Sequence, residues 1–319
     1  MSVLKKKIKM KCLICYKTLD NSETDYHEKC LKKEFGLKRM PSIDINEKEL
    51  KTHAIKLLEA NVAITGVQPK LSLWLEESKQ NIRFTIVDNK SNFIIKPQSD
   101  LYETLPENED LAMHLASEFG ISTAKHSLVK LATGNLAYIT KRFERTTEGK
   151  LACEDLCQLS EVLTEYKYRG SYEKVGKIIK QYSSQAGFDV LNFFELVLFN
   201  YIIGNADLHL KNFSMMEDEF GGFVLSPSYD LVSTFLVIKD ETEQMSLTIN
   251  GKKNRITRKD FDALAKNLDI NEKQKENIYK KFLTKNNNIE WWIKNSFLSE
   301  TQKGKFLEFI DTQINSLTP

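Results

Sequence analysis

Residues 204–212 read GNADLHLKN, a polar stretch that contains Asn, Asp, His and Lys side chains. It follows directly on residues 190–203, which are apolar on nearly every helical face and therefore predict a buried helix. Such a helix would be a rigid base for the polar groups behind it. Asp207 and Asn212 are five residues apart, and Asp230 follows 18 residues later in the segment LSPSYDL.

This spacing is typical of a phosphoryl-transfer site. A protein-kinase catalytic loop has the form D-x-x-x-x-N, in which the Asp accepts the proton of the attacking hydroxyl and the Asn holds Mg²⁺. Asp207 and Asn212 fit these roles, and Asp230 stands where a second magnesium-binding Asp is expected. Magnesium prefers oxygen ligands and uses one or two carboxylates with phosphate oxygens. Lys211 would neutralise charge on the transferring phosphoryl group. The alternative is an ordinary polar turn after a helix.

Composition and missing motifs exclude several other classes of protein. The 319 residues carry 46 Lys and Arg against 44 Asp and Glu, a net charge of +2, so the chain is no polycation built to coat nucleic acid. The sequence lacks G-x-x-x-x-G-K-[ST], G-x-S-x-G, H-E-x-x-H and G-x-G-x-x-G motifs. The commonest hydrolase and dehydrogenase mechanisms are therefore excluded.

The sequence predicts a cytoplasmic location without membrane contact. The apolar stretch 190–203 is interrupted by Asn192, Glu195 and Asn200 and is too short to span a bilayer. The first residues, MSVLKKKIKMK, lack the apolar core of a signal peptide. Five cysteines, an odd number, do not suggest a disulfide framework.

Strand-like and helical patterns divide the chain. The expected strands are the short runs 71–75, 84–87, 93–95, 128–131 and 136–143. One helix interrupts them, with Asn108 as its N-cap and Gly120 where it stops. Helical patterns dominate after about residue 150. We therefore predict an α+β chain with a Cys-rich segment over 1–40, a strand-rich N-lobe over 41–145 and a helical C-lobe over 146–319.

The N-terminal segment has a metal-ligand pattern, C-x₂-C-x₁₁-H-x₂-C, formed by Cys12, Cys15, His27 and Cys30. Cysteine and histidine in two closely spaced pairs suit a tetrahedral structural zinc ion. The alternative is a small capping hairpin whose three cysteines are buried as small apolar groups. Both interpretations stay open at the level of sequence.

Two further features have ordinary explanations. The first 40 residues carry a charge of +6, much of it in the lysine-rich run 5–11, which we interpret as a solvated tail. The alternative is a tail that contacts DNA phosphates without reading bases. Cys153 and Cys157 are one helical turn apart and are interpreted as core thiols.

Several motifs together resemble the HipA-type serine/threonine kinases, which are toxins of bacterial toxin–antitoxin systems. GNADLHLKN followed by SPSYDL is similar to the catalytic and metal-binding motifs of that family. Upstream pieces agree in order: ITGVQPK at 64–70, FIIKP at 93–97, KRFER at 141–145 and EDLCQ at 154–158. The resemblance covers roughly residues 60–315. It implies a bilobal protein-kinase-like fold that uses ATP and Mg²⁺.

The resemblance also implies a phosphate loop that can be modified. This loop would consist of Thr65, Gly66, Val67 and Gln68. Its backbone N–H groups would hold phosphate oxygens, and Gly66 would allow a close approach. Family members carry a phosphorylatable hydroxyl in this loop, and Thr65 is the candidate here.

Other site residues follow from the same resemblance. Lys96 would pair with the nucleotide phosphates, and Glu109 would orient that lysine. Lys141 to Phe143 is similar to the hinge whose backbone meets adenine. His209 lies in the family's D-x-H motif and is interpreted as orienting the loop.

The sequence departs from the longer family members in two places. Cys153 stands where they have a polar residue that helps to read adenine, and only about 40 to 60 residues precede the kinase core. The chain therefore resembles the short, HipT-like branch, in which a separate small protein supplies the missing N-terminal subdomain.

The function implied is a toxin kinase that phosphorylates a Ser or Thr of a protein, with an aminoacyl-tRNA synthetase as the expected target, so that translation and growth are inhibited. A DNA-binding antitoxin is the expected partner and would mediate most of the DNA contact. Two other classes stay open: a kinase-fold phosphotransferase acting on a small molecule, and a catalytically silent regulatory subunit.

Overall fold

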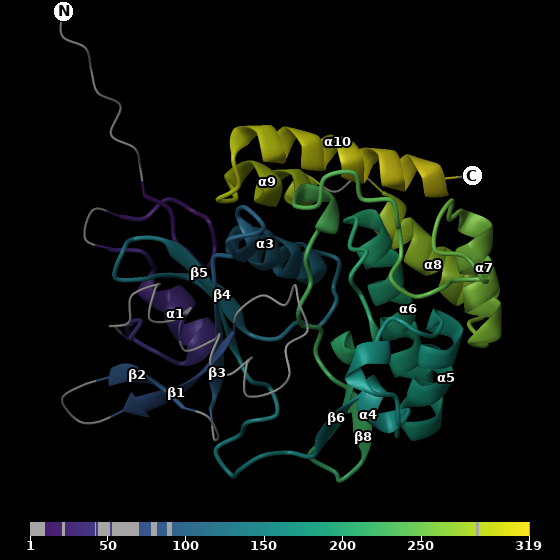
Figure 1. Cartoon of the computed structure of the whole chain (residues 1–319), viewed down its shortest axis with the longest axis horizontal. Coiled ribbons are helices and arrows are strands. Elements are labelled where there is room, and N and C mark those ends of the chain that lie inside the picture. Colours follow the sequence, from purple (N-terminus) through teal and green to yellow (C-terminus); the bar gives the residue numbers. More distant parts are fainter. Residues whose placement is uncertain are drawn as a thin grey trace, which may run out of the picture.

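A five-stranded antiparallel sheet forms one side of the molecule (Figure 1). The computed structural model describes residues 10–20, 23–41, 43, 52, 70–77, 82–87, 91–284 and 287–318. The strands are β1 (Leu71–Glu77), β2 (Ile82–Ile86), β3 (Phe93–Pro97), β4 (His126–Lys130) and β5 (Leu136–Lys141), in the order β2-β1-β3-β5-β4. These five strands and one helix confirm the predicted α+β first half. The ends of the strands differ from the predicted ones by no more than two residues.

Alternating residues of the strands build the core of this side. In β1, Leu71 and Leu73 are buried while Trp74 is exposed, as the two-residue period of a strand requires. Strand β3 lies in the centre of the sheet; its first three residues pair with β1, and the whole strand, including Lys96, pairs with β5. This central position fixes Lys96, the fourth residue of β3.

Helix α3 (Leu105–Glu118) packs between the sheet and the helical half of the molecule, in contact with β4 and β5. It begins four residues earlier than predicted, so the expectation that Asn108 caps it is wrong. Thr104 is the N-cap, and Pro106 stands in the first turn, where its fixed φ favours a helix and no N–H is needed. The helix ends as predicted at Gly120, whose φ of +75° stops it.

The second half is mainly helical, as predicted. Its principal helices are α5 (Tyr172–Tyr182), α6 (Ala186–Ile202), α7 (Arg258–Asn267), α8 (Glu272–Leu283), α9 (Asn287–Asn295) and α10 (Glu300–Leu317). Helix α6 is the predicted buried helix, and most of its side chains are inaccessible. In Figure 1, α10 crosses the top of the view with α9 beneath it.

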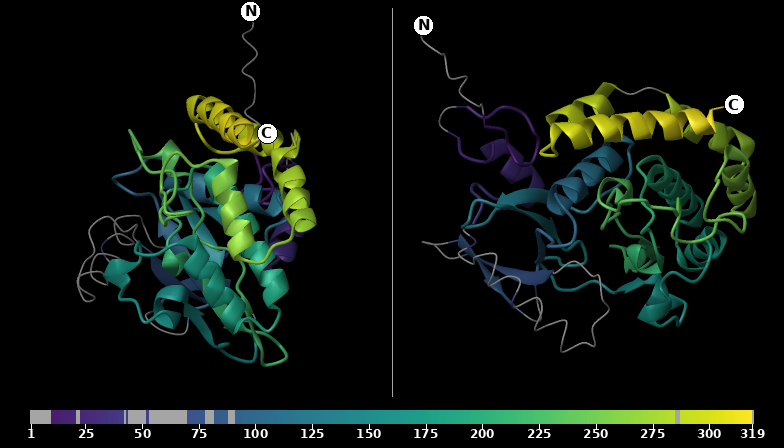
Figure 2. Two further views of the ribbon diagram at one scale, coloured as in Figure 1. Left: turned by 90° about the vertical axis from the view of Figure 1, so that its right-hand side faces the viewer. Right: turned by 45° about the horizontal axis from the view of Figure 1, so that its top comes forward.

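A small sheet, which the sequence did not reveal, frames the polar loops. It consists of β6 (Cys153–Asp155), β7 (Ser214–Glu217) and β8 (Phe223–Leu225) in the order β6-β7-β8, beside the short helix α4 (Leu156–Leu159). Strand β7 follows the GNADLHLKN stretch, and β8 precedes Asp230. The two halves lie side by side with α3 between them (Figure 2).

The N-terminal segment covers part of the five-stranded sheet. Its helix α1 (Glu28–Phe35) buries Leu31 and Phe35, and Phe35 contacts Phe93 of β3 edge-to-face with ring centroids 5.7 Å apart. The Tyr26 hydroxyl donates a 2.8 Å hydrogen bond to the carbonyl oxygen of Leu128 in β4. Among the helices that the structure describes, none has the length and apolar character needed to cross a bilayer.

Candidate active site

Lys96 is the centre of the site. Its Nζ donates hydrogen bonds to Glu109 Oε1 at 2.6 Å and to Asp230 Oδ1 at 2.5 Å. Strand β3, helix α3 and the loop after β8 therefore meet at one ammonium group. Lys96 and Glu109 are buried, whereas the Asp230 side chain is 45% exposed. Lys70 is a second cation close to the same carboxylates, so two lysines and two acidic groups gather at this point.

The pKa values of these groups reflect burial and pairing. Burial raises the pKa of Glu109 to about 7, against the opposing effect of the Lys96 ammonium. Enclosure also disfavours ionisation of Asp230, yet the neighbouring Lys96 holds the pKa of Asp230 well below its usual range. Asp230 is thus the carboxylate of this pair that stays ionised throughout the neutral range.

Asn212 connects Asp230 to the GNADLHLKN loop. Its Nδ2 donates to Asp230 Oδ2 at 2.9 Å, and its Oδ1 accepts a 2.9 Å hydrogen bond from the backbone N–H of His209. An amide oxygen has two acceptor positions, so one is left for a metal ion. Asp230 itself adopts a φ of +59°, a left-handed conformation of the kind found at functional sites.

His209 lies buried within the GNADLHLKN loop. Burial lowers the pKa of His209 to about 4, so its ring is neutral at physiological pH. The ring lies edge-to-face on Tyr168, with ring centroids 5.1 Å apart. Its Nδ1 is buried and has no hydrogen-bond partner among the described residues. The role of His209 in orienting the loop stays a prediction.

Asp207 is held at the end of a chain of side-chain amides that begins in α6. Asn205 Nδ2 donates to Asn200 Oδ1 at 2.6 Å, and Asn205 Oδ1 accepts a 2.9 Å hydrogen bond from the Asp207 N–H. Asn200 and Asn205 are buried, so the backbone of Asp207 is fixed from the core outward. Burial raises the pKa of the Asp207 carboxyl above its ordinary value, which suits a proton acceptor.

Two partners of the loop were not found from the sequence. The hydroxyl of Tyr168, a residue 42% exposed, donates a 2.5 Å hydrogen bond to Asp207 Oδ1. Lys211 Nζ donates to Asp155 Oδ2 at 2.6 Å, so this lysine is paired across to the end of β6. Asp155 lies in the EDLCQ motif and could have been suspected from it, whereas nothing in the sequence around Tyr168 indicates its contact.

The residues fit a magnesium–nucleotide complex. Asp230 presents a partly exposed carboxylate, and Asn212 has a free acceptor position on its amide oxygen. Glu109 Oε2 is a buried oxygen without a hydrogen-bond partner among the described residues. These are the oxygen donors that Mg²⁺ prefers.

Comparison with known proteins identifies the family. A family model described as the HipA-like C-terminal domain matches residues 62–289, more than two thirds of the chain. The chain belongs to this family. A Sinorhizobium fredii protein named "Putative kinase Y4dM" is 31% identical to it over 225 residues, which are 66% of this chain and 54% of that protein. The serine/threonine-protein kinase toxin HipA of Shewanella oneidensis is 27% identical over 212 residues, 60% of this chain and 47% of the toxin. The chain thus spans about half the length of the curated relatives it matches.

Solved structures show that the HipA-like chain has a kinase-like fold. HipA in the Shewanella oneidensis MR-1 complex of HipA, HipB and operator DNA aligns with a TM-score of 0.63 and 19% identity, covering 93% of this chain and 73% of that chain. The Helicobacter pylori proinflammatory kinase CtkA aligns with a TM-score of 0.53 and 16% identity, covering 76% and 93%. The predicted bilobal, protein-kinase-like α+β fold is confirmed.

The expected phosphate loop of this HipA-like chain, Thr65 to Gln68, lies outside the described residues, as do residues 5–9 of the lysine-rich run. The first described residue after the loop is Lys70. It precedes Leu71, which pairs with Ile95 of β3. Lys70 therefore leads into the strand that lies next to the one carrying Lys96.

The expected hinge lies at the end of β5. Lys141 is the last residue of that strand, and its backbone N–H donates a 2.8 Å hydrogen bond to the carbonyl oxygen of Lys125. Phe143 is half-buried, and its ring lies against Tyr229, next to Asp230, at a centroid distance of 5.6 Å. The backbone N–H of Lys141 is thus already hydrogen-bonded within the protein.

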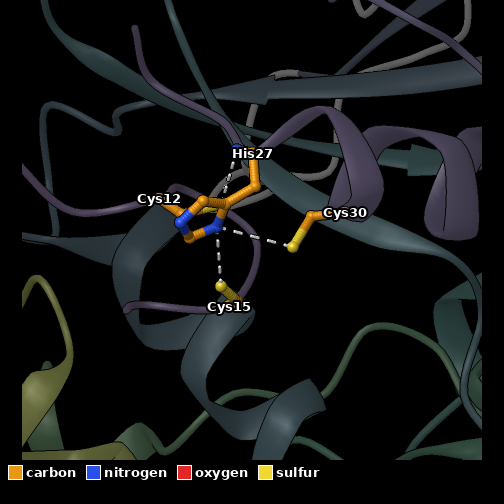
Figure 3. A group of neighbouring side chains, drawn as sticks. All are labelled: Cys12, Cys15, His27 and Cys30. Carbon is orange, nitrogen blue, oxygen red and sulfur yellow. Dashed lines mark hydrogen bonds between the residues drawn. The ribbon is translucent and has the colours of Figure 1, made fainter. Parts of the chain in front are cut away.

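The N-terminal cysteines and histidine also come together (Figure 3). The ligand atoms of Cys12, Cys15, His27 and Cys30 all lie within 4.8 Å of one another, and the cysteines are not joined in disulfides. Cys153 and Cys157 lie elsewhere, in β6 and α4. The structure therefore brings the four predicted ligands into one group and leaves the other two cysteines out of it.

Proposed function

We propose that this protein is an ATP-dependent serine/threonine protein kinase that acts as the toxin of a toxin–antitoxin system. The observation that carries the proposal is the pairing of Lys96 with both Glu109 and Asp230, with Asn212 bound to the same aspartate. A protein kinase requires a lysine–glutamate pair, a magnesium-binding Asp and a catalytic-loop Asn. A silent scaffold has no need of all four.

In the proposed reaction, the γ-phosphoryl group of ATP passes to a Ser or Thr hydroxyl oxygen of a protein, and ADP leaves. Lys96 binds the nucleotide phosphates, Asp230 and Asn212 hold Mg²⁺, and Asp207 accepts the proton of the acceptor hydroxyl. Bound Mg²⁺ supplies neutralisation of phosphate charge. Lys211 approaches the phosphoryl group only if it leaves Asp155. Catalysis then comes from positioning and electrostatics.

The target and partners are proposed from the family. An aminoacyl-tRNA synthetase is the proposed substrate, and its phosphorylation would stop translation in the cytoplasm. The structure of HipA from Shewanella oneidensis contains HipB and operator DNA. We therefore propose a DNA-binding antitoxin as a partner here, and a separate small protein in place of the N-terminal subdomain of longer relatives.

Incubation of the purified protein with Mg²⁺, radiolabelled ATP and a host lysate tests the function. A labelled protein band that is absent with Asp207→Asn protein supports the proposal. Labelled small metabolites would instead identify a small-molecule phosphotransferase, and no transfer at all would indicate a silent subunit. Partners are tested by capture from the host with the Asp207→Asn protein as bait.

Self-phosphorylation at Thr65 is proposed as the off-switch. A phosphate there adds a charge of about −1.5 to −2, which would repel the ATP phosphates from the loop. Mass spectrometry should detect phospho-Thr65 in active protein and none in Asp207→Asn protein. An unmodified loop in active protein, together with unchanged toxicity and ATP affinity in Thr65→Ala, would contradict the switch.

A further inference from the structure

The geometry of the N-terminal group agrees with a metal centre. Zinc bound tetrahedrally at about 2.3 Å from sulfur and about 2.0–2.1 Å from nitrogen places a sulfur and a nitrogen ligand about 3.5 Å apart. Cys15 Sγ and Cys30 Sγ lie 3.3 and 3.7 Å from His27 Nδ1, on either side of this value. Figure 3 shows both sulfur atoms directed toward the imidazole.

The surroundings of the four side chains suit metal ligands. His27 Nε2 lies 3.2 Å from the carbonyl oxygen of Thr18, so a proton on Nε2 is hydrogen-bonded and leaves Nδ1 free for a metal. The backbone N–H of His27 donates to Cys12 Sγ at 3.4 Å, which favours a thiolate.

The capping-hairpin alternative explains the group less well. Cys12 is fully buried, but Cys15 and Cys30 are partly exposed and gain little as small apolar groups. Apolar packing also gives no reason for an imidazole nitrogen to face two thiols. A metal ion accounts for both observations.

The residue after the turn that carries Cys12 and Cys15 places its side chain against helix α3. Tyr16 follows Cys15 and adopts a φ of +57°, which is uncommon for a residue with a side chain. Its ring is buried, and its hydroxyl donates a 2.6 Å hydrogen bond to Asp110 Oδ2 in α3. Asp110 is the neighbour of Glu109, which pairs with Lys96.

We propose that Cys12, Cys15, His27 and Cys30 bind one structural Zn²⁺, and that this centre holds Tyr16 against α3 of the catalytic site. Zinc fixes the Cys12–Tyr16 turn and the start of α1 together, because Cys30 lies in that helix. Tyr16 then restrains Asp110, whose other oxygen accepts a 2.7 Å hydrogen bond from His126 Nδ1. Metal binding in the N-terminal segment thereby positions the helix that carries Glu109.

Metal content tests the first half of the proposal. Wild-type protein purified without chelator should contain about one zinc per chain by elemental analysis, as one four-ligand site implies. Cobalt should replace zinc and give the visible absorption of tetrahedral thiolate coordination. Cys12→Ser/Cys15→Ser and His27→Ala protein should lose the metal, and the matched control Cys153→Ser should keep it. Because cobalt is added to the wild-type chain, this result does not depend on any variant folding.

Two outcomes would overturn the site. The first is wild-type protein that contains no zinc and takes up no cobalt. The second is zinc that persists in the Cys12→Ser/Cys15→Ser protein, because the metal would then be bound elsewhere, for example by the group of Asp110, His114 and His126.

Tyr16→Phe tests the connection to α3. This variant should keep its zinc but lose several degrees of melting temperature and bind ATP several-fold more weakly. Chelator-treated wild-type protein should show the same two losses, and zinc should restore both. Unchanged melting temperature and ATP affinity in Tyr16→Phe would overturn the connection while the zinc site stands. Zinc content and melting temperature do not depend on the proposed kinase activity.

Discussion

The two oxygens of Asp230 contact different parts of the molecule. Oδ1 accepts from Lys96 and Oδ2 from Asn212, so one carboxylate connects the sheet to the GNADLHLKN loop. A metal ion that binds here must share the carboxylate with both partners. Asp207 makes none of these contacts, since its hydrogen bonds go to Asn205 and Tyr168. The two aspartates are therefore expected to respond differently to the same substitution.

Asp207→Asn should reduce phosphoryl transfer by about 10²–10⁴-fold, because a general base is lost. Its affinity for magnesium–ATP should stay close to that of the wild type. Asp230→Asn should weaken magnesium–ATP binding as well, because it removes a metal ligand. Calorimetric titration with ATP and Mg²⁺, beside a transfer assay, separates the two. Equal loss of ATP affinity in both variants would contradict the assigned roles.

Glu109 should make activity pH-dependent. With a pKa of about 7, its carboxylate is ionised above that pH and pairs with Lys96, and it is protonated below. Activity should therefore fall as the pH decreases through 7. The contribution of this group to stability has the opposite sign: the folded state binds the proton more tightly than the unfolded state, so stability falls as the pH rises from about 4.5 to 7.

Both pH dependences should disappear in Glu109→Gln, measured by transfer rates and by denaturant unfolding. Exposed Glu103→Gln serves as the control and should keep both profiles. A transition near pH 7 that persists in Glu109→Gln would assign it to another group.

At the scale of the elements, the buried helix α6 and the strands of the first half could be predicted, because each has a clear hydrophobic period. The start of α3 could not, since Asn108 has the chemistry of a cap but is used for a tertiary contact. The strands β6, β7 and β8 have only three or four residues, too few for a visible period. Asp207, Asn212 and Asp230 could be selected as candidate site residues from their spacing in the sequence. The Tyr168 contact depends on tertiary folding and left no local signal.

Gly204, at the junction of α6 and the GNADLHLKN loop, is expected to tolerate no side chain. Its φ is +67°, and an added Cβ would lie 2.6 Å from Phe309 of α10, whose ring stacks on Phe235. Gly221 has a similar φ of +78° with nothing within 4 Å of such a Cβ. Gly221→Ala should therefore cost only the left-handed strain, about 1–2 kcal/mol. Gly204→Ala should cost more, and urea unfolding measures the difference. Equal losses of unfolding free energy in the two variants would contradict this expectation, because the Phe309 ring would then move away from the added Cβ without cost.

On the scale of the whole molecule, α3 joins the two halves. The Asn108 side chain donates to the carbonyl oxygen of Ser233 at 2.9 Å and accepts from its N–H at 2.8 Å. Ser233 lies three residues after Asp230, and Glu109 is the residue after Asn108 in α3. The hydrogen bonds between Asn108 and Ser233 therefore join the segments that carry Glu109 and Asp230. Helix α9 packs on another part of α3 and continues into α10. The relative position of the halves is thus set by polar contacts as well as by the core.

Asn108→Ala should loosen this junction. It leaves a buried N–H and a buried carbonyl of Ser233 without partners, at a cost of about 1–3 kcal/mol for each group. We expect a lower melting temperature and a higher KM for ATP, because Glu109 and Asp230 lose a common support. Asn267→Ala, whose side chain is exposed and bonds within α7, should change stability by no more than about 0.5 kcal/mol. If Asn108→Ala changes only the melting temperature, the junction is structural alone.

The hydrogen bond from Tyr168 to Asp207 has a consequence for how an acceptor would arrive. The phenol fills one acceptor position of Asp207 Oδ1, so a seryl or threonyl hydroxyl would bind the other oxygen, Oδ2, share Oδ1 with the phenol, or take its place. Where the hydroxyl takes the place of the phenol, the exchange gains little binding energy at the reacting oxygen, because one O–H···O⁻ bond replaces another. Discrimination among acceptor proteins must then come from contacts made away from the transferred phosphate.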